Sequence, residues 1–351
     1  MTVPIAWGTY TPIIKQLYTF DPPVPGLIFS TAYYAIAFGL LSLASWGWTS
    51  ANRSANRSAN SSELDSAVEA DPDAGGLDEG PNGLQRASLE LSSYLFFGNI
   101  LQLIGLQTTS ATKSAFLVQL TTIIVPVLSS FLNKYPLKPS TVLACLTAFL
   151  GVTILSLDGG LTSLDSFSVG NIMKSLNKGD ILILISSISY SLHVVRLGVI
   201  AKNIDPTILA INKSKYELIY GLIGCSFIYY FGGGNFGDFG GEEFRVWIKH
   251  FWEEGIRNAS ELKTLAGAAV WTGAVTCGWT IWAQSFGQRS VKAENANLIY
   301  TSQPLASAAF AYILLGETLQ GMAWVGASLI GAALAIVLIE ERRGGGDKQN
   351  R

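Results

Sequence analysis

The chain has 351 residues, of which 49% are hydrophobic and only 14% are charged. A soluble domain carries about 25% charged residues, so this composition indicates a membrane protein. The formal net charge of -2 provides no basic surface of the kind that binds nucleic acid. The three cysteines, Cys145, Cys225 and Cys277, lie inside apolar runs without metal-ligand spacing, so they predict buried packing residues.

Apolar runs long enough to cross a membrane recur along the chain, since a tilted helical span needs about 17 to 25 residues. They cover residues 26–48, 89–107, 114–132, 139–157, 181–200, 207–231, 264–286, 294–315 and 320–340. The first stretch, Val3 to Tyr18, is also apolar but too short. We interpret it as a truncated first span that begins upstream, which makes ten predicted spans.

Two segments between the predicted spans differ in composition from the rest. Residues 49–87 contain ANRSANRSANSS followed by acidic residues among Gly and Pro, which predicts a disordered insert between spans two and three. Residues 242–257 place apolar side chains every three or four positions with charges between them. This spacing predicts an amphipathic helix on the membrane surface, and a short helix packed over the loop ends is the alternative.

A pattern of five residues at helical spacing occurs twice. Ala293, Asn297, Tyr300, Pro304 and Ser307 share one face, and 178 residues earlier stand Ala115, Gln119, Thr122, Pro126 and Ser129. Gly98 and Gly278 are 180 residues apart, as are Gly151 and Gly331, and Asp21-Pro22 and Asp205-Pro206 are 184 apart. We therefore divide the chain into two halves, near residues 1–160 and 175–342. Internal repeats in a membrane protein are typical of transporters with a site between the halves.

The predicted fold class is an all-α polytopic membrane protein with ten transmembrane helices in two inverted five-helix repeats. Spans one and two lie in residues 1–48, spans three to five in 88–158, and spans six to ten in 175–342, which includes the amphipathic loop 232–263. Lys and Arg are concentrated in the loops on the side that holds both termini and the insert. This bias predicts that both termini face the cytosol or the stroma, in a plasma membrane or a plastid envelope.

Several segments resemble the EamA module of the drug/metabolite transporter superfamily. One copy is resembled by AENANLIYTSQPLASAAFAYILLGETL followed by GASLIGAALAIVLIE, and the first copy by residues 114–158. AWGTYTPIIK resembles the opening span of the family, and GDILILISSISYSLHVV resembles its sixth span. The resemblance implies ten helices, a central cavity, alternating access and secondary transport of small metabolites without ATP hydrolysis. Where a Gly-Glu pair is typical, the first copy has Asn133-Lys134-Tyr135, so Glu317 has no counterpart there.

Polar and aromatic side chains at mid-membrane depth are the candidate substrate contacts, because they are costly in lipid unless they face protein or a wet cavity. The candidates are Trp7, Tyr10, Asn99, Gln102, Gln119, Thr122, Tyr190, His193, Trp279, Trp282, Asn297, Tyr300 and Gln303. Amides would hydrogen-bond a polar solute, and indoles would stack on a ring or hold a cation. Hydrogen bonding between packed helices is the alternative role for each.

Two prolines are candidate hinges in the repeated pattern. Pro126 and Pro304 each remove a backbone hydrogen bond from their helix. Gln119 and Asn297 precede them by seven residues and therefore share their face two turns away. We expect these amides to be paired polar contacts.

Ionisable groups also fall inside predicted spans. His193 is a candidate proton relay or a structural histidine. Lys15 either reaches the interface or attracts an anionic substrate. Glu217 can pair with Lys213 one turn earlier, as a structural pair or as a proton-coupling site.

The sequence predicts a secondary-active transporter of a small organic metabolite, with a proton as the candidate coupling ion and the lipid bilayer around it. A non-transporting scaffold or receptor on the same bundle is the alternative. An intramembrane enzyme or an ATP-driven pump is disfavoured, because no Walker loop, HExxH or CxxC motif occurs. No cofactor, metal or nucleic-acid partner is predicted, and a homodimer is left open.

Overall fold

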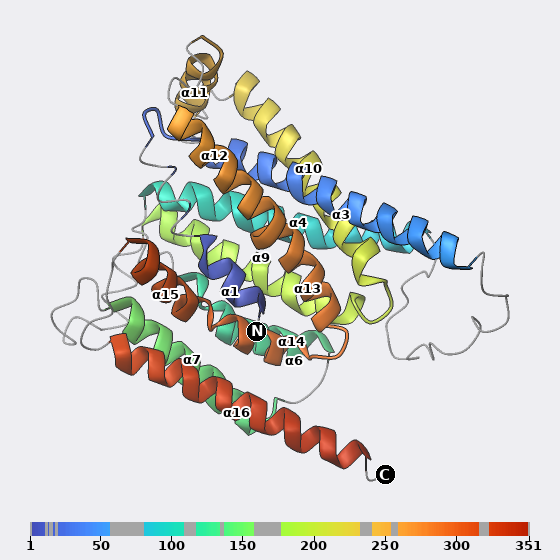
Figure 1. Cartoon of the computed structure of the whole chain (residues 1–351). Helices are drawn as coiled ribbons and strands as arrows, with labels where there is room; N and C mark the ends of the chain where they lie inside the picture. The colour runs from blue at the N-terminus through green and yellow to red at the C-terminus, as the bar shows by residue number, and fades with distance from the viewer. Residues whose placement is uncertain are drawn as a thin grey trace.

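The computed structural model describes residues 2–10, 13, 17, 20–56, 81–108, 117–133, 137–157, 177–231, 241–253, 259–315 and 323–349. Over these residues the chain forms helices joined by turns, without a strand (Figure 1). The helices are α1 (Thr2–Gly8), α3 (Gly26–Asn56), α4 (Pro81–Thr108), α6 (Thr121–Asn133), α7 (Pro139–Leu157), α9 (Lys178–Ile200), α10 (Pro206–Phe231), α11 (Gly241–Glu253), α12 (Ala259–Trp271), the π-helix η3 (Thr272–Trp279), α13 (Thr280–Gly287), α14 (Ala293–Tyr300), α15 (Gln303–Leu315) and α16 (Ala323–Gln349).

The starts of two long helices follow directly from their sequence. α9 begins with a capping box, in which the Asn177 side chain accepts from the Asp180 N–H and the Asp180 carboxylate accepts from the Asn177 N–H, each at 2.8 Å. α10 begins at Pro206, whose fixed φ suits a first helical position. Asp205 caps it, because its side chain accepts from the Thr207 N–H at 2.8 Å.

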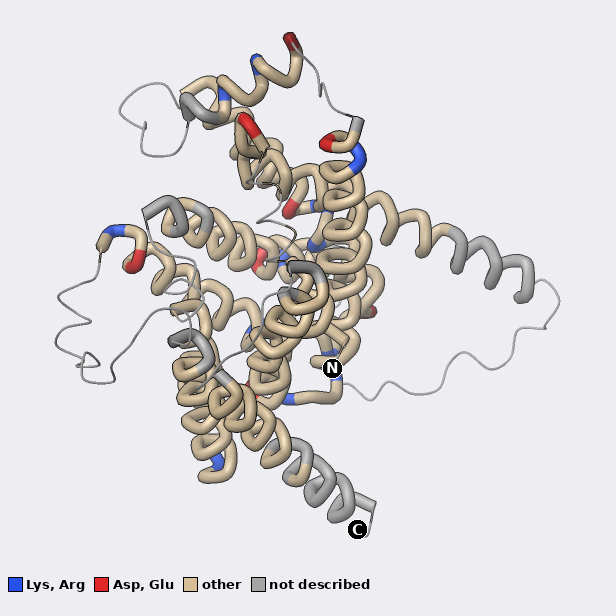
Figure 2. The backbone as a smooth tube through the Cα atoms, turned by 60° about the vertical axis from the view of Figure 1, so that its left-hand side comes forward, with Lys and Arg blue, Asp and Glu red and all other residues tan. Residues whose placement is uncertain are grey.

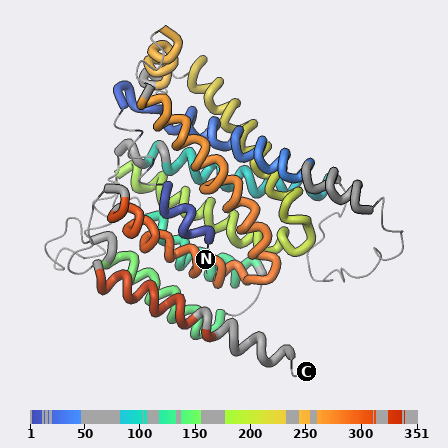
Figure 3. The backbone as a smooth tube through the Cα atoms, viewed as in Figure 1, coloured from blue at the N-terminus to red at the C-terminus, as the bar shows by residue number. Residues whose placement is uncertain are grey.

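Helices that are far apart in the sequence lie side by side. α7 packs along α16 at one side of the molecule, and α4 packs along α9 (Figures 1 and 3). α3 contacts both α10 and η3, α6 contacts α9 and α14, and α1 contacts α15. The early and late parts of the chain are therefore interleaved, and a site in the interior draws residues from both.

Large apolar side chains cover much of the outside of the bundle. Trp46, Phe131 and Tyr230 are 71%, 79% and 72% exposed. In Figure 2 the charged residues, blue and red, are short and widely separated along helices that are otherwise tan. Among the described residues, Gly26–Trp46 and Lys178–Ile200 are long and apolar enough to cross a membrane. An apolar surface of this extent suits contact with lipid or with a partner better than contact with water.

The predicted span 294–315 is broken in the structure. α14 ends at Tyr300 and a turn of Thr301 and Ser302 precedes α15. Pro304 explains the break, because it has no N–H with which to bond the carbonyl of Tyr300 four residues before it. The hydroxyls of Thr301 and Ser302 donate back to carbonyls of α14 at 2.6 and 2.7 Å. Both turn residues are thereby held to the preceding helix.

The predicted span 264–286 contains a π-helix that the sequence did not indicate. η3 lies between α12 and α13 and has the wider turn of a π-helix. A Cβ atom at Gly278 would lie 2.9 Å from the carbonyl oxygen of Gly273, five residues earlier. Glycine at position 278 therefore leaves room for the wider turn. Pro126, in contrast, lies inside a helix that continues past it.

The segment predicted as an insert is helical at both of its ends. α3 continues to Asn56, and α4 already begins at Pro81. Proline is favourable at a first helical position, which explains the early start of α4. Residues 57–80, which hold all of the acidic side chains of the insert, lie outside the described residues.

The predicted amphipathic helix is present as α11, and protein covers part of its apolar face. Phe244 is only 3% exposed, and Trp247 packs against the main buried cluster of the bundle. Trp247 also stacks on Phe251 at 5.2 Å between ring centroids, whereas Trp252 is 80% exposed. α11 thus combines packing over the bundle with an outward-facing aromatic side chain.

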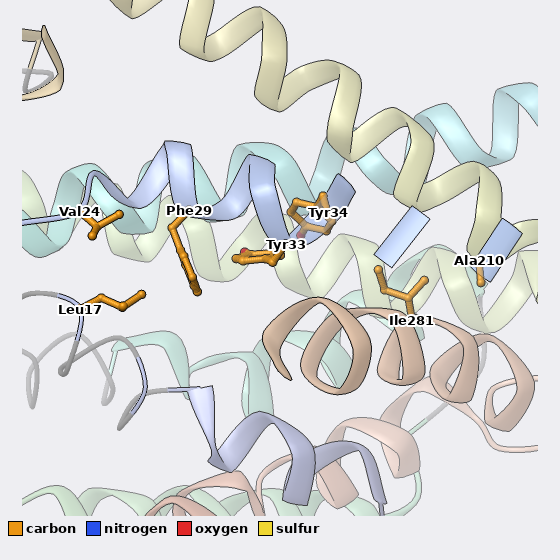
Figure 4. Packing of buried hydrophobic residues seen from close by; sticks show 7 residues of the cluster. All are labelled: Leu17, Val24, Phe29, Tyr33, Tyr34, Ala210 and Ile281. Carbon is orange, nitrogen blue, oxygen red and sulfur yellow. The ribbon is translucent and has the colours of Figure 1, made fainter. Parts of the chain in front are cut away.

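The main buried cluster joins α3 to α10 and α13. It consists of Leu17, Val24, Phe29, Tyr33, Tyr34, Ala210 and Ile281 (Figure 4). Two members, Tyr33 and Tyr34, bring hydroxyl groups into an otherwise apolar interior. They lie at the edge of the candidate site described next.

Candidate functional site

Four side chains from three helices form a hydrogen-bonded network inside the bundle. The Tyr190 hydroxyl on α9 lies 2.7 Å from the Asn99 side-chain oxygen and 2.8 Å from the Gln102 side-chain oxygen, both on α4. Its proton is therefore shared between two acceptors. The Asn99 amide in turn donates to the Tyr34 hydroxyl on α3 at 3.1 Å. The network brings together the predicted candidates Asn99, Gln102 and Tyr190 and adds Tyr34.

The close approach of α4 and α9 depends on glycines. A Cβ at Gly105 would lie 2.7 Å from the Gly179 carbonyl oxygen. Gly98 faces the ring of Tyr190 in the same interface. These glycines let the backbone of α4 approach α9 closely enough for the amides to reach Tyr190.

A cationic side chain is buried next to this network. Lys213 on α10 is 0% exposed, and its Nζ lies 3.4 Å from Nε2 of His193 on α9. The other ring nitrogen of His193, Nδ1, lies 3.2 Å from the Leu91 carbonyl oxygen on α4. Since a carbonyl only accepts, Nδ1 carries the proton, and Nε2 of a neutral imidazole accepts from Lys213. His193 thus links three helices.

The acidic group of the site lies one turn further along α10. Glu217 is 0% exposed, and neither of its carboxyl oxygens has a hydrogen-bond partner among the described residues. Its carboxyl interacts electrostatically with Lys213, Tyr34, Tyr190 and Cys277. The Tyr34 hydroxyl approaches it closely but outside hydrogen-bond geometry. Buried polar groups are rarely left without hydrogen bonds, so this carboxyl calls for an explanation.

Aromatic rings extend the site toward α1 and α14. Tyr10 meets Tyr33 edge to face at 6.4 Å between ring centroids. The Tyr33 and Tyr34 rings lie 4.7 Å apart. Trp7 meets Tyr300 edge to face at 5.2 Å. Trp7 on α1 and Tyr10 just after it therefore contact aromatic residues of α14 and α3, respectively.

The predicted polar contacts of the two proline helices mainly hold those helices together. The Asn297 amide donates to the Thr121 carbonyl oxygen at 3.0 Å. The Ser129 hydroxyl donates to the Glu294 carboxylate at 2.8 Å, and both bonds join α6 to α14. Thr122 is buried nearby, and its hydroxyl has no hydrogen-bond partner among the described residues. The remaining candidates of these helices, Gln119 and Gln303, are partly buried.

The predicted tryptophans of η3 and α13 lie outside the hydrogen-bonded network. Trp279 is 45% exposed, and its ring lies 5.1 Å from that of Trp282. Trp282 stacks on Phe286 at 5.4 Å and donates from its indole to the Thr207 hydroxyl at 3.2 Å. These rings form an aromatic row along one side of the helix rather than an indole counterpart of Asn99 and Gln102.

Sequence reasoning did not single out Tyr34 and Tyr33. The signal was present, since both are hydroxyl-bearing aromatics in the middle of an apolar run. It also did not predict the ion pair between Arg196 and Glu90, which connects α9 to α4. Two residues with candidate roles in the sequence, Lys15 and Glu317, lie outside the described residues.

Other parts of the described chain offer less chemistry. Within the ranges that the structure describes, no three His, Cys, Asp or Glu side chains are grouped as metal ligands. A pocket of about 530 Å³ lies between α10 and α11, away from the network. It is lined by Tyr229, Arg245, Ile248, Lys249, Trp252 and Glu253.

Comparison with known proteins identifies the family. The model of the EamA-like transporter family matches residues 1–157 and again residues 177–339. A solved crystal structure of another protein aligns with a TM-score of 0.65 at 13% sequence identity, covering 97% of this chain and 96% of the other, and shows that the fold is shared. No curated protein matches the chain. Because the family model covers most of the sequence, the chain belongs to the EamA-like transporter family of the drug/metabolite transporter superfamily and is an integral, multi-pass membrane protein.

Proposed function

We propose that the protein is a secondary-active transporter that moves a small organic metabolite by alternating access, without ATP hydrolysis. The observation that carries this proposal is the network of Tyr34, Asn99, Gln102 and Tyr190 inside an apolar bundle. Polar side chains at membrane depth are costly and usually mark a substrate or ion pathway. A scaffold would need helix packing but no such cluster of donors and acceptors.

The proposed architecture is ten spans in two inverted repeats of five. The two separate matches to the family model, one in each half of the chain, support a repeat. Pairings between the halves also support it, since α7 packs on α16 and α3 on α10. We further propose that both termini face the cytosol or the stroma. Single cysteines placed in residues 57–80 and 232–240 would be labelled with a membrane-impermeant reagent to test this. Labelling of residues 57–80 from the outside would show that the orientation is opposite to the proposed one.

The substrate site is proposed to lie between α3, α4, α9 and α1. The amides and tyrosine hydroxyls there can donate and accept hydrogen bonds, and the rings of Tyr10, Tyr33 and Tyr34 offer stacking surfaces. Such a lining fits a small polar solute with an unsaturated or ring portion.

Uptake into proteoliposomes tests the function. Purified protein would be reconstituted and offered radiolabelled amino acids, dicarboxylates, sugars, nucleobases and organic cations, with and without an imposed pH gradient. We expect saturable uptake of at least one class above that of empty liposomes, and a Tyr190→Ala variant should lose it. Absence of uptake for every class by correctly inserted protein would favour a scaffold or receptor.

A further inference from the structure

Among the described residues of the site, Glu217 is a buried acidic group that helix packing does not explain. A structural i, i+4 pair with Lys213 would place the ammonium on the carboxylate. Lys213 Nζ instead lies 3.4 Å from His193 Nε2, and both Glu217 oxygens lack hydrogen-bond partners among the described residues. The two side chains share one face of α10 and are fully buried, yet they are not bonded to each other.

An ionised carboxylate in this position would be unusually costly. A buried charge is tolerated when hydrogen bonds and an opposite charge surround it, and it is strongly unfavourable otherwise. A protonated carboxyl carries no charge and fits the same space without a salt bridge. The surroundings of Glu217 therefore fit a protonated carboxyl group.

The groups that face Glu217 come from its own helix and from α3, α9 and η3, whereas α13, which also packs on α10, has no ionisable side chain. Lys213 lies on the same helix, Tyr34 on α3, Tyr190 on α9 and Cys277 on η3. His193 of α9 reaches the carboxyl only through Lys213. α4, which also packs on α10, contributes the uncharged Ser92, whose hydroxyl donates to the Lys213 carbonyl at 3.0 Å. Lys213 is thus the sole cationic neighbour of the carboxyl among the described residues.

We propose that Glu217 binds the proton that couples transport, and that Lys213 changes partner when this proton leaves; the coupling role rests on the proposed transport function. When the bundle opens to the side of lower proton activity, the carboxyl O–H bond breaks and the proton passes to water. The resulting carboxylate then pairs with the Lys213 ammonium, which leaves His193. On the other side water returns a proton to the carboxyl, and Lys213 goes back to His193.

This exchange of partners gives the proton a mechanical effect. With Glu217 protonated, the Lys213–His193 contact joins α10 to α9, and His193 continues the link to α4 through Leu91. With Glu217 ionised, the ion pair lies within α10 alone, and the link between the helices is lost. Because Tyr190 of the polar network faces the same carboxyl, the change is transmitted to the proposed substrate site.

The first experiment detects the proton directly and needs no substrate. Infrared difference spectra of the full chain in lipid nanodiscs, recorded through a pH titration, report the C=O stretch of a protonated carboxyl. We expect such a band in the wild type, its loss in Glu217→Gln, and its persistence in Glu90→Gln. Glu90 is the matched control, since it is an acid of the same bundle that is paired with Arg196. Equal elution volumes on size-exclusion chromatography and equal melting temperatures would show that the Glu217→Gln variant folds as the wild type does.

The second experiment connects the proton to transport. Proteoliposomes containing the pH-sensitive dye pyranine would be exposed to each solute class used in the uptake test. If one proton moves with each solute in an electroneutral step, a gradient of one pH unit supports about tenfold accumulation. We expect Glu217→Gln to abolish the dye response and the accumulation while downhill equilibration continues, and Glu90→Gln to retain all three.

The outcomes separate this proposal from the proposed function. A titrating carboxyl band that persists in Glu217→Gln overturns the proton site, whatever transport shows. Saturable uptake without proton movement overturns the coupling role and leaves the transport function standing. A band that is lost in Glu217→Gln, with no uptake of any class by the wild type, overturns the transport function and its coupling, while the proton site itself is established.

Discussion

The ring of Tyr190 lies directly against Gly98, where a Cβ atom would come within 2.5 Å of the ring carbon Cε1. The glycine on α4 therefore sets the position of the tyrosine on α9, and that position decides whether the hydroxyl reaches Asn99 and Gln102. A residue without hydrogen-bonding groups thus shapes the polar network.

Gly98→Ala should displace the Tyr190 ring and lower transport more than stability. The added methyl group meets a side chain that can rotate away, so the fold is expected to survive. Uptake in proteoliposomes should fall at least tenfold. Gly39→Ala is the matched control, because nothing lies within 4 Å of a Cβ there. In a helix interior that change should stabilise by about 0.5 to 1 kcal/mol and leave uptake intact.

Tyr190→Phe should separate packing from hydrogen bonding at the same residue. The ring keeps its contact with Gly98, but Asn99 and Gln102 lose a donor that lies 2.7 and 2.8 Å away. The free energy of unfolding should fall by about 1 kcal/mol, and the substrate affinity should fall as well. Thermal melting and the KM of uptake measure the two effects. Normal KM in this variant would mean that the network only supports the fold.

Asn297→Leu should weaken the contact between the two proline helices. Its amide donates to the Thr121 carbonyl at 3.0 Å, and leucine leaves that carbonyl without this donor. We expect a loss of about 1 kcal/mol of stability, as found for other hydrogen bonds between membrane helices. Gln119→Leu, at the equivalent position of the first half, removes a partly buried amide instead. If Gln119→Leu lowers uptake without a change in melting, Gln119 contacts substrate and Asn297 holds helices together.

Gly8→Ala should destabilise the contact of α1 with α15. A Cβ there would lie 2.6 Å from the Ala306 Cβ and 2.8 Å from the Ser307 backbone nitrogen. Neither atom belongs to a flexible side chain, so the helices must move apart, at a cost of about 1 to 3 kcal/mol. The Ser307 hydroxyl, which donates to the Gly8 carbonyl at 3.2 Å, would lose this bond. Thermal melting in detergent should show a lower midpoint than Gly39→Ala, and an equal midpoint would contradict the close packing of α1 on α15.

The helices were largely predictable, because a long apolar run in a membrane can satisfy its backbone hydrogen bonds within the segment only as a helix. The runs 139–157 and 207–231 agree closely with α7 and α10. The π-helix η3 was not predictable, since it reflects backbone geometry around Gly273 and Gly278 rather than a pattern of apolar residues. Pro304 signalled a disturbed helix, but the full break also depends on the turn at Thr301 and Ser302.

The candidate site was predictable only in part. Asn99, Gln102 and Tyr190 stood out as polar groups in apolar runs, and the structure joins them. The separation of Glu217 from Lys213 did not follow from their spacing, because the same spacing allows an ion pair. What decides the difference is His193 on another helix, and a single sequence does not show which helix faces meet.

The repeat offset was informative about positions but not about roles. Gly98 and Gly278 correspond along the chain, yet Gly98 makes room for the Tyr190 ring and Gly278 for the wider turn of η3. Likewise, Asn99 and Gln102 bond to Tyr190, whereas Trp279 and Trp282 form an aromatic row. Gly151 and Gly331 also differ, since a Cβ at Gly151 would lie 2.8 Å from the Gly326 carbonyl oxygen and nothing lies within 4 Å of one at Gly331. Equivalent positions therefore meet different neighbours in the two halves.

The break between α14 and α15 also bears on how the chain enters the bilayer during synthesis. α14 has 8 residues and α15 has 13 residues, which at 1.5 Å per residue span only about 12 and 20 Å. Neither crosses a hydrocarbon layer of about 30 Å alone, so the proposed ten-span topology requires the insertion machinery to accept residues 293–315 as one segment. The bonds that hold α14, from Asn297 to Thr121 and from Ser129 to Glu294, come from α6. Because α6 is synthesised first, its docking surface is already in place when the later segment arrives.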